Sequence, residues 1–241
     1  MRYFIELAYK GTHFHGWQVQ PGAITVQESI EKALSTKLRT TIRLTGAGRT
    51  DAGVHASFFV AHFDTDAQFN PSVVILGLNH LVGQDIVIYK IYSVKADLHA
   101  RFDAKSRCYE YRISRIKNPF YKETTTLLTR TLDIDLMREA SAILFNHQDF
   151  TSFSKLHTDT KTNNCKIMQA EWIENGQLLI FKIKADRFLR NMVRAIVGTL
   201  LDVGEKKITP EEFERIIIAK NRSLAGQSAP PEGLFLTNIE Y

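Results

Sequence analysis

Residues 25–64 read TVQESIEKALSTKLRTTIRLTGAGRTDAGVHASFFVAHFD and decide the fold. Thr25, with Glu28 three residues later, is typical of a capping box, so we predict that a helix begins here and continues to about Arg39. Residues of high strand propensity then lie on both sides of the glycine-rich stretch GAGRTDAGVH (46–55). The segment therefore predicts a helix followed by two strands that a glycine-rich loop joins.

The alternation of strands and helices continues outward from this segment. Asn70 with Pro71, and Thr209 with Pro210, have the residue types of an N-cap and a first helical position. In the first half we expect strands at 2–9, 41–45, 57–64 and 85–94 and helices at 25–39 and 70–81. In the second half we expect strands at 108–114, 165–174, 178–185 and 233–241 and helices at 134–145, at 188–204 and from 209 onward.

Both halves thus follow the order β-α-β-β-α-β, with one extra helix in the second. That order is typical of the ferredoxin-like split βαβ unit. We therefore predict an α+β protein of two ferredoxin-like halves with their sheets side by side. Residues 1–103 would carry the GAGRTDAGVH loop, and residues 104–241 would carry the basic segment IKADRFLRNMVR. Such a pair of halves predicts a basic active-site cleft between them.

Composition excludes several classes of protein. With 241 residues, 44% of them hydrophobic and 24% charged, the chain is expected to fold around a sizeable core. It has no apolar run of the roughly 18 residues that a membrane span needs, so we expect a soluble, cytoplasmic protein. Two distant cysteines suggest neither a disulfide framework nor a zinc site. A net charge of +5 favours a polyanionic partner, although a basic surface without a partner is equally compatible with it.

The glycine-rich loop is the first candidate for chemistry. Its three glycines flank Arg49 and Asp51 and would permit positive φ values and close approach of a ligand to the backbone. A phosphate-binding loop is disfavoured because the lysine and hydroxyl residue that follow its last glycine are absent. From the residues alone, a structural strand connection and a carboxylate site are about equally supported. A metal site of His13, His15, His55 and Asp51 is disfavoured because no established ligand spacing is present.

The loop also resembles, almost letter for letter, the catalytic motif of the tRNA pseudouridine synthase A (TruA-type) family. Further matches run along nearly the whole chain in the same order. They are Y-x-G-x-x-F-x-G-W-Q at 9–18, V-Q-x-x-(I/L)-E-x-A-L at 26–34, HARFDA-x-x-R-x-Y-x-Y at 99–111, DFTSF at 149–153, IKAD-x-FL-x-(N/H)-M-V-R-x-I-V-G at 183–198, and AP-x-x-GL-x-L near the C-terminus.

The resemblance implies roles for particular residues. Asp51 falls on the family's nucleophile, and Arg49 on an arginine associated with flipping the target nucleotide. Tyr109 falls on the tyrosine that packs on the target base. Arg194, with Arg190 beside it, falls in the helix whose arginine pairs with the catalytic aspartate. Stretches that contact tRNA correspond to Leu98, His99, Ala100, Arg101 and Phe102 and to His157, Thr158, Asp159, Thr160 and Lys161.

The resemblance also implies a substrate and an assembly. Family members act on uridines at positions 38 to 40 in the anticodon stem-loop of tRNA, as homodimers, without metal or organic cofactor. An ionised carboxylate in a dry pocket needs a cation beside it, and Arg194 is the expected partner of Asp51. A non-catalytic RNA-binding module and a carboxylate-dependent hydrolase are the rival functions, and the hydrolase is disfavoured because only one carboxylate is credibly placed.

Tyr109 and the arginines near residue 190 also have a purely structural interpretation. Tyr109 alternates with Tyr111 along a predicted strand, where one aromatic residue commonly faces the core and the other solvent. Arg187, Arg190 and Arg194 have the spacing of one helical face, and a solvated basic stripe would account for them. We keep Arg187 only as a possible phosphate contact.

Overall fold

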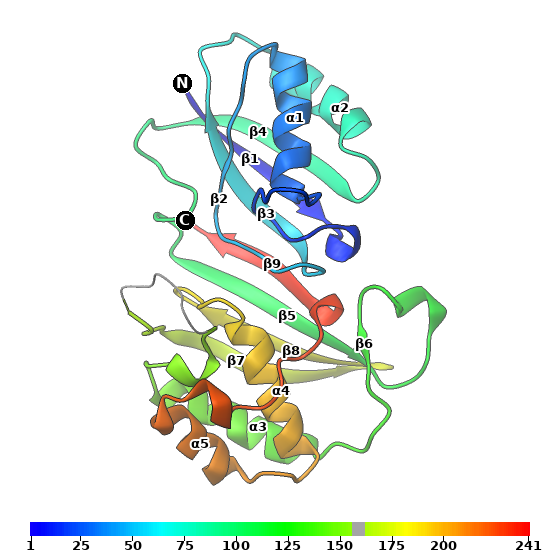
Figure 1. The fold of residues 1–241 in the computed structure, drawn as a ribbon, viewed down its shortest axis with the longest axis vertical. Coiled ribbons are helices and arrows are strands. Elements are labelled where there is room, and N and C mark those ends of the chain that lie inside the picture. Colours follow the sequence, from blue (N-terminus) through cyan, green and yellow to red (C-terminus); the bar gives the residue numbers. More distant parts are fainter. Residues whose placement is uncertain (156–161) are drawn as a thin grey trace. The chain divides into compact units, whose positions relative to one another are not determined.

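The computed structural model describes residues 1–155 and 162–241 as a mixed α+β protein with five α-helices among the described residues (Figure 1). The chain forms two compact units, which are described separately below. Unit 1 comprises Met1–Lys105 and Phe235–Tyr241, and unit 2 comprises Ser106–Leu234. The coarse prediction of an α+β fold is therefore confirmed.

Unit 1 is a sheet with two helices that pack against each other (Figure 1). Its strands lie in the order β4, β1, β3, β9, with the short β2 paired to β3. β1 is antiparallel to both neighbours, whereas β9 runs parallel to β3. Along the chain its elements are β1 (Arg2–Tyr9), α1 (Val26–Leu38), β2 (Thr45–Gly46), β3 (His55–Asp64), α2 (Pro71–Leu81), β4 (Ile86–Val94) and β9 (Leu234–Glu240).

Both helices of unit 1 begin where the sequence predicts. The Thr25 hydroxyl accepts a hydrogen bond from the backbone N–H of Glu28 at 3.3 Å, and Asn70 caps α2 in the same way through Ser72. A cap of this kind stabilises a helix by about 1 kcal/mol. α1 ends at Leu38 because the next residue, Arg39, has a left-handed backbone with φ of 53°.

One predicted strand of unit 1 is much shorter than expected. Of residues 41–45 only Thr45 lies in a strand, where it and Gly46 pair with His62 and Ala61 of β3. The preceding residues are not part of the sheet. Their backbone groups are bonded instead to side chains of α1, which periodicity alone could not reveal.

Unit 2 contains three long antiparallel strands, one short strand and three α-helices among its described residues. Its strands lie in the order β5, β8, β7, and the short β6 runs parallel to β5. The β7–β8 turn uses Gly176 with φ of 58°, a conformation that favours glycine. Its elements are β5 (Ser106–Ser114), β6 (Thr126–Leu127), α3 (Ile134–Ile143), β7 (Ile167–Asn175), β8 (Leu178–Ala185), α4 (Met192–Gly204) and α5 (Pro210–Ala219).

The helices of unit 2 surround a buried α4. Ten of its thirteen residues are buried, so this helix is apolar on nearly every side and packs against α3 and α5. α5 begins with the complete capping box that Thr209 and Glu212 predict. Among the helices described, none combines the length and apolar character required to cross a membrane.

Candidate active site

The glycine-rich loop 46–55 is held from one side by the segment that follows β1. The backbone N–H of Trp17 donates to the carbonyl of Thr50 at 3.2 Å. The hydroxyl of Thr50 also lies 2.8 Å from the hydroxyl of Tyr9. The loop is therefore fixed at its centre by both backbone and side-chain contacts.

Close packing on this side explains Gly46 in the loop and Gly16 in the segment that follows β1. A Cβ atom at Gly16 would lie 2.4 Å from the Thr50 carbonyl oxygen, and one at Gly46 would lie 2.5 Å from Nε1 of Trp17. Gly53 is required for a different reason, since its φ is 79°. Of the three glycines in the loop, only Gly53 has the positive φ that the glycine-rich sequence suggests.

The loop also carries two of the predicted catalytic residues. Arg49 is exposed and Asp51 is half-buried. The Asp51 carbonyl accepts the N–H of Val54 at 3.2 Å, which closes a tight turn directly after the carboxylate. Gly48 faces open space, with no atom within 4 Å of the position of a Cβ. The loop thus carries an acid and a guanidinium two residues apart, and the contacts of Thr50 hold it in place.

His55, at the end of the loop, has a structural role. It is fully buried, its Nδ1 accepts the backbone N–H of Gly11 at 3.0 Å, and its ring stacks on Phe235 with centroids 4.5 Å apart. One ring nitrogen is therefore already occupied. Within residues 1–155 and 162–241, no group of three or more His, Cys, Asp or Glu residues could hold a metal ion.

One of the two predicted RNA-contacting stretches, 98–102, also belongs to unit 1. It is anchored through Ala100. The N–H of Ala100 donates to Nδ1 of His62 at 3.1 Å, and its carbonyl accepts from the Tyr241 hydroxyl at 2.8 Å. Burial lowers the pKa of His62 to about 4, so its ring is neutral near pH 7 and keeps this nitrogen free to accept.

The rest of that stretch is held through its backbone groups, and Arg101 and Phe102 are exposed. Arg2 donates to the Leu98 carbonyl at 3.1 Å, and Nδ1 of His99 accepts the N–H groups of Arg101 and Phe102. Phe102 is left 73% exposed, with the Arg101 guanidinium 5.6 Å from its ring centre. An exposed aromatic ring can stack on an unpaired base, and a cation beside it can bind the phosphate of that nucleotide.

In unit 2, two tyrosines of β5 have different surroundings. Tyr111 is fully buried and its hydroxyl bonds to Thr126 at 2.6 Å and to the carbonyl of Pro230 at 2.8 Å, so burial raises its pKa well above the usual range. Tyr109 is half-buried, with its ring edge-on to Phe188 at 5.1 Å between centroids. Tyr111 is therefore structural, whereas Tyr109 is partly exposed.

The prediction that Arg187, Arg190 and Arg194 lie on one helical face is wrong. Asn191 has a left-handed backbone with φ of 66°, and α4 begins only at Met192. Arg187 and Arg190 therefore precede the helix, and Arg194 alone lies in its first turn. Arg190 is exposed, whereas Arg194 is half-buried. The spacing of the three arginines is correct for a helix, but the chain is not helical before position 192.

Sequence reasoning missed the contact that fixes Arg194. Its Nε donates to the carbonyl of Ala229 at 2.7 Å, and its own carbonyl accepts the N–H of Ala229 at 2.9 Å. The side chain of Asn191 donates to Ser228 at 2.6 Å, so the same segment also holds the start of α4. The AP motif at residues 229 and 230 is the feature of the sequence that could have indicated this contact.

Comparison with known proteins identifies the family of the chain. A family model described as tRNA pseudouridine synthase matches residues 7–103 and 140–241. The chain belongs to the tRNA pseudouridine synthase family. The tRNA pseudouridine synthases A of Bacteroides fragilis and Parabacteroides distasonis are 55% and 52% identical to it, each over the whole chain and 96% of the relative. That of Bacillus licheniformis is 40% identical over the whole chain and 99% of the relative.

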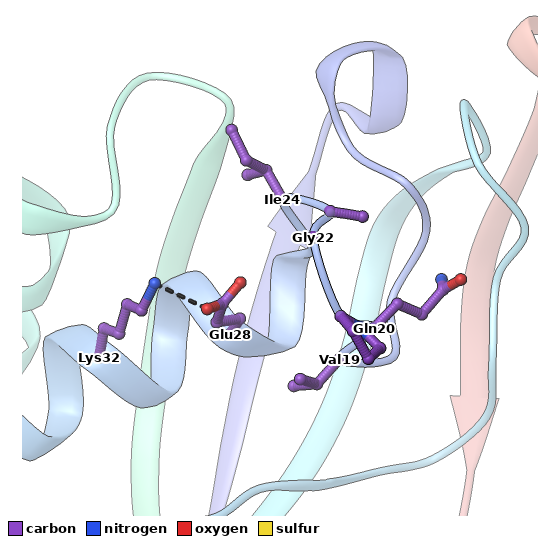
Figure 2. A pocket seen from close by; sticks show the side chains of 8 residues that line it. Val19, Gln20, Gly22, Ile24, Glu28 and Lys32 are labelled. Carbon is purple, nitrogen blue, oxygen red and sulfur yellow. Dashed lines mark ion pairs between the residues drawn. The ribbon is translucent and has the colours of Figure 1, made fainter.

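Two further regions are the predicted tRNA-contacting stretch 157–161 and a hollow beside α1. The predicted tRNA contacts at 157–161 lie outside the described residues. A hollow of about 470 Å³ lies at the start of α1, where Glu28 and Lys32 form an ion pair at 2.7 Å (Figure 2). None of the predicted site residues that the structure describes lines it. Its labelled lining residues are Val19, Gln20, Gly22, Ile24, Glu28 and Lys32.

Proposed function

We propose that this chain converts uridine to pseudouridine at positions 38 to 40 in the anticodon stem-loop of tRNA, with Asp51 as the nucleophile. Membership of the family makes it an isomerase that acts on tRNA. The observation that carries the finer proposal is the loop 46–55. It combines the family's motif with a carboxylate on a turn that is fixed from one side and open at Gly48.

The reaction is an isomerisation and needs no oxidant or co-substrate. The bond between C1′ of the ribose and N1 of uracil breaks, the base rotates, a bond forms between C1′ and C5, and the proton on C5 moves to N1. The carboxylate of Asp51 can add to C6 of the base, add to C1′ of the sugar, or remove a proton from C2′. Each route requires the ionised form of Asp51 and a base held away from water.

The remaining site residues receive supporting roles. Arg49, exposed beside the carboxylate, would take the place of the flipped nucleotide or bind its phosphate. Tyr109 would stack on the flipped uracil, with its phenol near the C5 proton. Arg194 would supply the cation that keeps the catalytic carboxylate ionised. Its bond to Ala229 fixes the guanidinium through Nε and supports such a role.

Binding of the tRNA would use the exposed basic and aromatic groups. Arg101 and Phe102 provide a cation and a stacking surface, and Arg190 is an exposed cation just before α4. Flipping a nucleotide costs a few kcal/mol, which such contacts can offset. We further propose that the protein works in the cytoplasm as a homodimer, without metal or cofactor.

Site-resolved mapping of pseudouridine tests the proposed positions. Three unmodified tRNAs, each with uridine at only one of positions 38, 39 and 40, are incubated with the protein, alongside a tRNA with cytidine at all three. We expect pseudouridine at the single uridine of each substrate and none in the fourth tRNA. Pseudouridine elsewhere in the tRNA, with none at positions 38 to 40, would contradict the proposed positions.

A further inference from the structure

The motif V-Q-x-x-I-E in α1 is not explained by the proposed chemistry. Its two polar residues, Gln27 and Glu31, bond to each other and to Leu44. They take no part in the ion pair of Glu28 with Lys32 (Figure 2). Glu31 is only 4% exposed although it is a carboxylate. A buried charged residue requires partners, and those partners indicate what the motif does.

The partners lie in the extended segment that leads into the loop 46–55. Leu44 donates its N–H to Oε1 of Glu31 at 2.8 Å, and its carbonyl accepts from Nε2 of Gln27 at 3.0 Å. Two residues earlier, the N–H of Ile42 donates to the hydroxyl of Ser35 at 2.9 Å. Gln27, Glu31 and Ser35 are spaced by four residues and so lie on one face of α1. This row of side chains, which we call the α1 ladder, bonds the segment where a neighbouring strand normally would.

Gln27 connects the ladder to the other support of the loop. Its backbone N–H donates to the carbonyl of Trp17 at 3.0 Å, and its Oε1 accepts the N–H of Val19 at 3.2 Å. Its Nε2 donates to Glu31 as well as to Leu44. Trp17 in turn binds the centre of the catalytic loop. One amide side chain therefore ties together the two segments that hold the loop at its entry and at its centre.

We infer that Gln27 and Glu31 are positioning residues for the reaction. They set the entry of the loop 46–55 and, through it, the place of Asp51. The inference rests on the proposed function, because it assigns the residues to the turnover of uridine. Without Glu31, Leu44 retains a buried N–H without this acceptor, and the segment must move to satisfy it. A shift of about 1 Å at a reacting group can slow a reaction by up to roughly 100-fold.

Substitutions at two carboxylates of α1 that have different partners provide the test. Glu31→Ala removes the ladder's central acceptor, and Glu28→Ala removes a carboxylate from the same helix at a surface ion pair. Glu31→Gln keeps an acceptor oxygen for Leu44. At saturating tRNA we expect Glu31→Ala to slow single turnover at least about 10-fold with little change in tRNA affinity. Glu28→Ala and Glu31→Gln should stay within roughly threefold of the wild type.

Amide hydrogen exchange at Ile42 and Leu44 gives a readout that does not depend on activity. Both amides should exchange faster in Glu31→Ala than in Glu28→Ala, and Ser35→Ala, a milder change, should accelerate Ile42 alone. A folded Glu31→Ala protein that turns over as fast as Glu28→Ala would overturn the inference. So would a Ser35→Ala protein in which exchange of Ile42 is unchanged. If the wild-type protein made no pseudouridine, the proposed function would fail, while the exchange rates would still decide whether the ladder exists.

Discussion

Gly48 is a glycine that the folded chain itself does not require. Three other glycines with equally open surroundings, Gly22, Gly83 and Gly176, have positive φ, and Gly48 does not. Backbone conformation and packing therefore leave the missing side chain unexplained. Close approach of a substrate to the loop beside Asp51 would explain it.

This explanation predicts opposite effects of two alanine substitutions. Gly48→Ala should leave the free energy of unfolding unchanged or raise it by up to about 1 kcal/mol, because it restricts the unfolded chain, yet lower turnover at least about 10-fold. Gly83→Ala should cost about 1 kcal/mol of stability, because φ there is 78°, and leave turnover unchanged. Urea unfolding and single-turnover assays measure both quantities. Full activity of Gly48→Ala would show that nothing approaches the loop closely at this residue.

Arg49 can be separated from the other cations by comparing rate with affinity. It is exposed, so truncation to alanine should not alter the fold. If it acts on the flipped nucleotide, Arg49→Ala should slow conversion by more than it weakens tRNA binding at low salt. Equal losses in the two assays would make Arg49 an electrostatic anchor only. Arg101→Ala is a suitable comparison, because its proposed role is binding alone.

At the scale of elements, β3 holds the stretch 98–102 through a neutral histidine. Burial is the main cause that lowers the pKa of His62 to about 4, and the charges of Arg2 and His99 act in the same direction. Above pH 7 the residue is neutral in both the folded and the unfolded chain. As the pH falls toward 5, the unfolded chain binds a proton and the folded protein does not, so the free energy of unfolding decreases.

We predict that this histidine contributes about 2 kcal/mol to the loss of stability between pH 7.5 and pH 5. His62→Asn keeps an acceptor for the N–H of Ala100 but cannot titrate, so the loss should be smaller by that amount. Urea unfolding of both proteins at the two pH values provides the comparison. The same pH dependence in wild type and variant would show that His62 is not neutral in the fold.

The elements show how far the sequence could predict the fold. Local signals sufficed where a cap residue is bonded within its own helix, as with Thr25, Asn70 and Thr209. They failed where a distant segment replaces a local partner. Residues 41–44 alternate like a strand but bind α1 side chains, and the first turn of the predicted fourth helix is broken at Asn191, which bonds to Ser228.

At the scale of the whole molecule, the sequence predicted the family and the candidate residues but not their supports. Asp51 and Tyr109 could be named because their neighbours in the chain form motifs. The supporting contacts of Thr50, Tyr109 and Arg194 come from Tyr9, Phe188 and Ala229. In each of these pairs the two residues lie tens of residues apart in the sequence, and no short pattern encodes such a contact.

The proposed assembly makes a prediction at the same scale. A homodimer should give a mass by light scattering of twice the 27.5 kDa of one chain at micromolar concentration. Added tRNA should increase the mass further. A mass of one chain across that range would contradict the dimer without affecting the proposed chemistry.

The central claim, that Asp51 carries out the chemistry, is tested most directly by mapping pseudouridine in unmodified tRNA after incubation with wild type and with Asp51→Asn. The carboxamide keeps the shape of the side chain but is neither a nucleophile nor a base, and it does not contribute to attraction of phosphate. We predict pseudouridine with wild type, none with Asp51→Asn, and tRNA binding by both. Pseudouridine formation by a folded Asp51→Asn protein at the wild-type rate would contradict the claim.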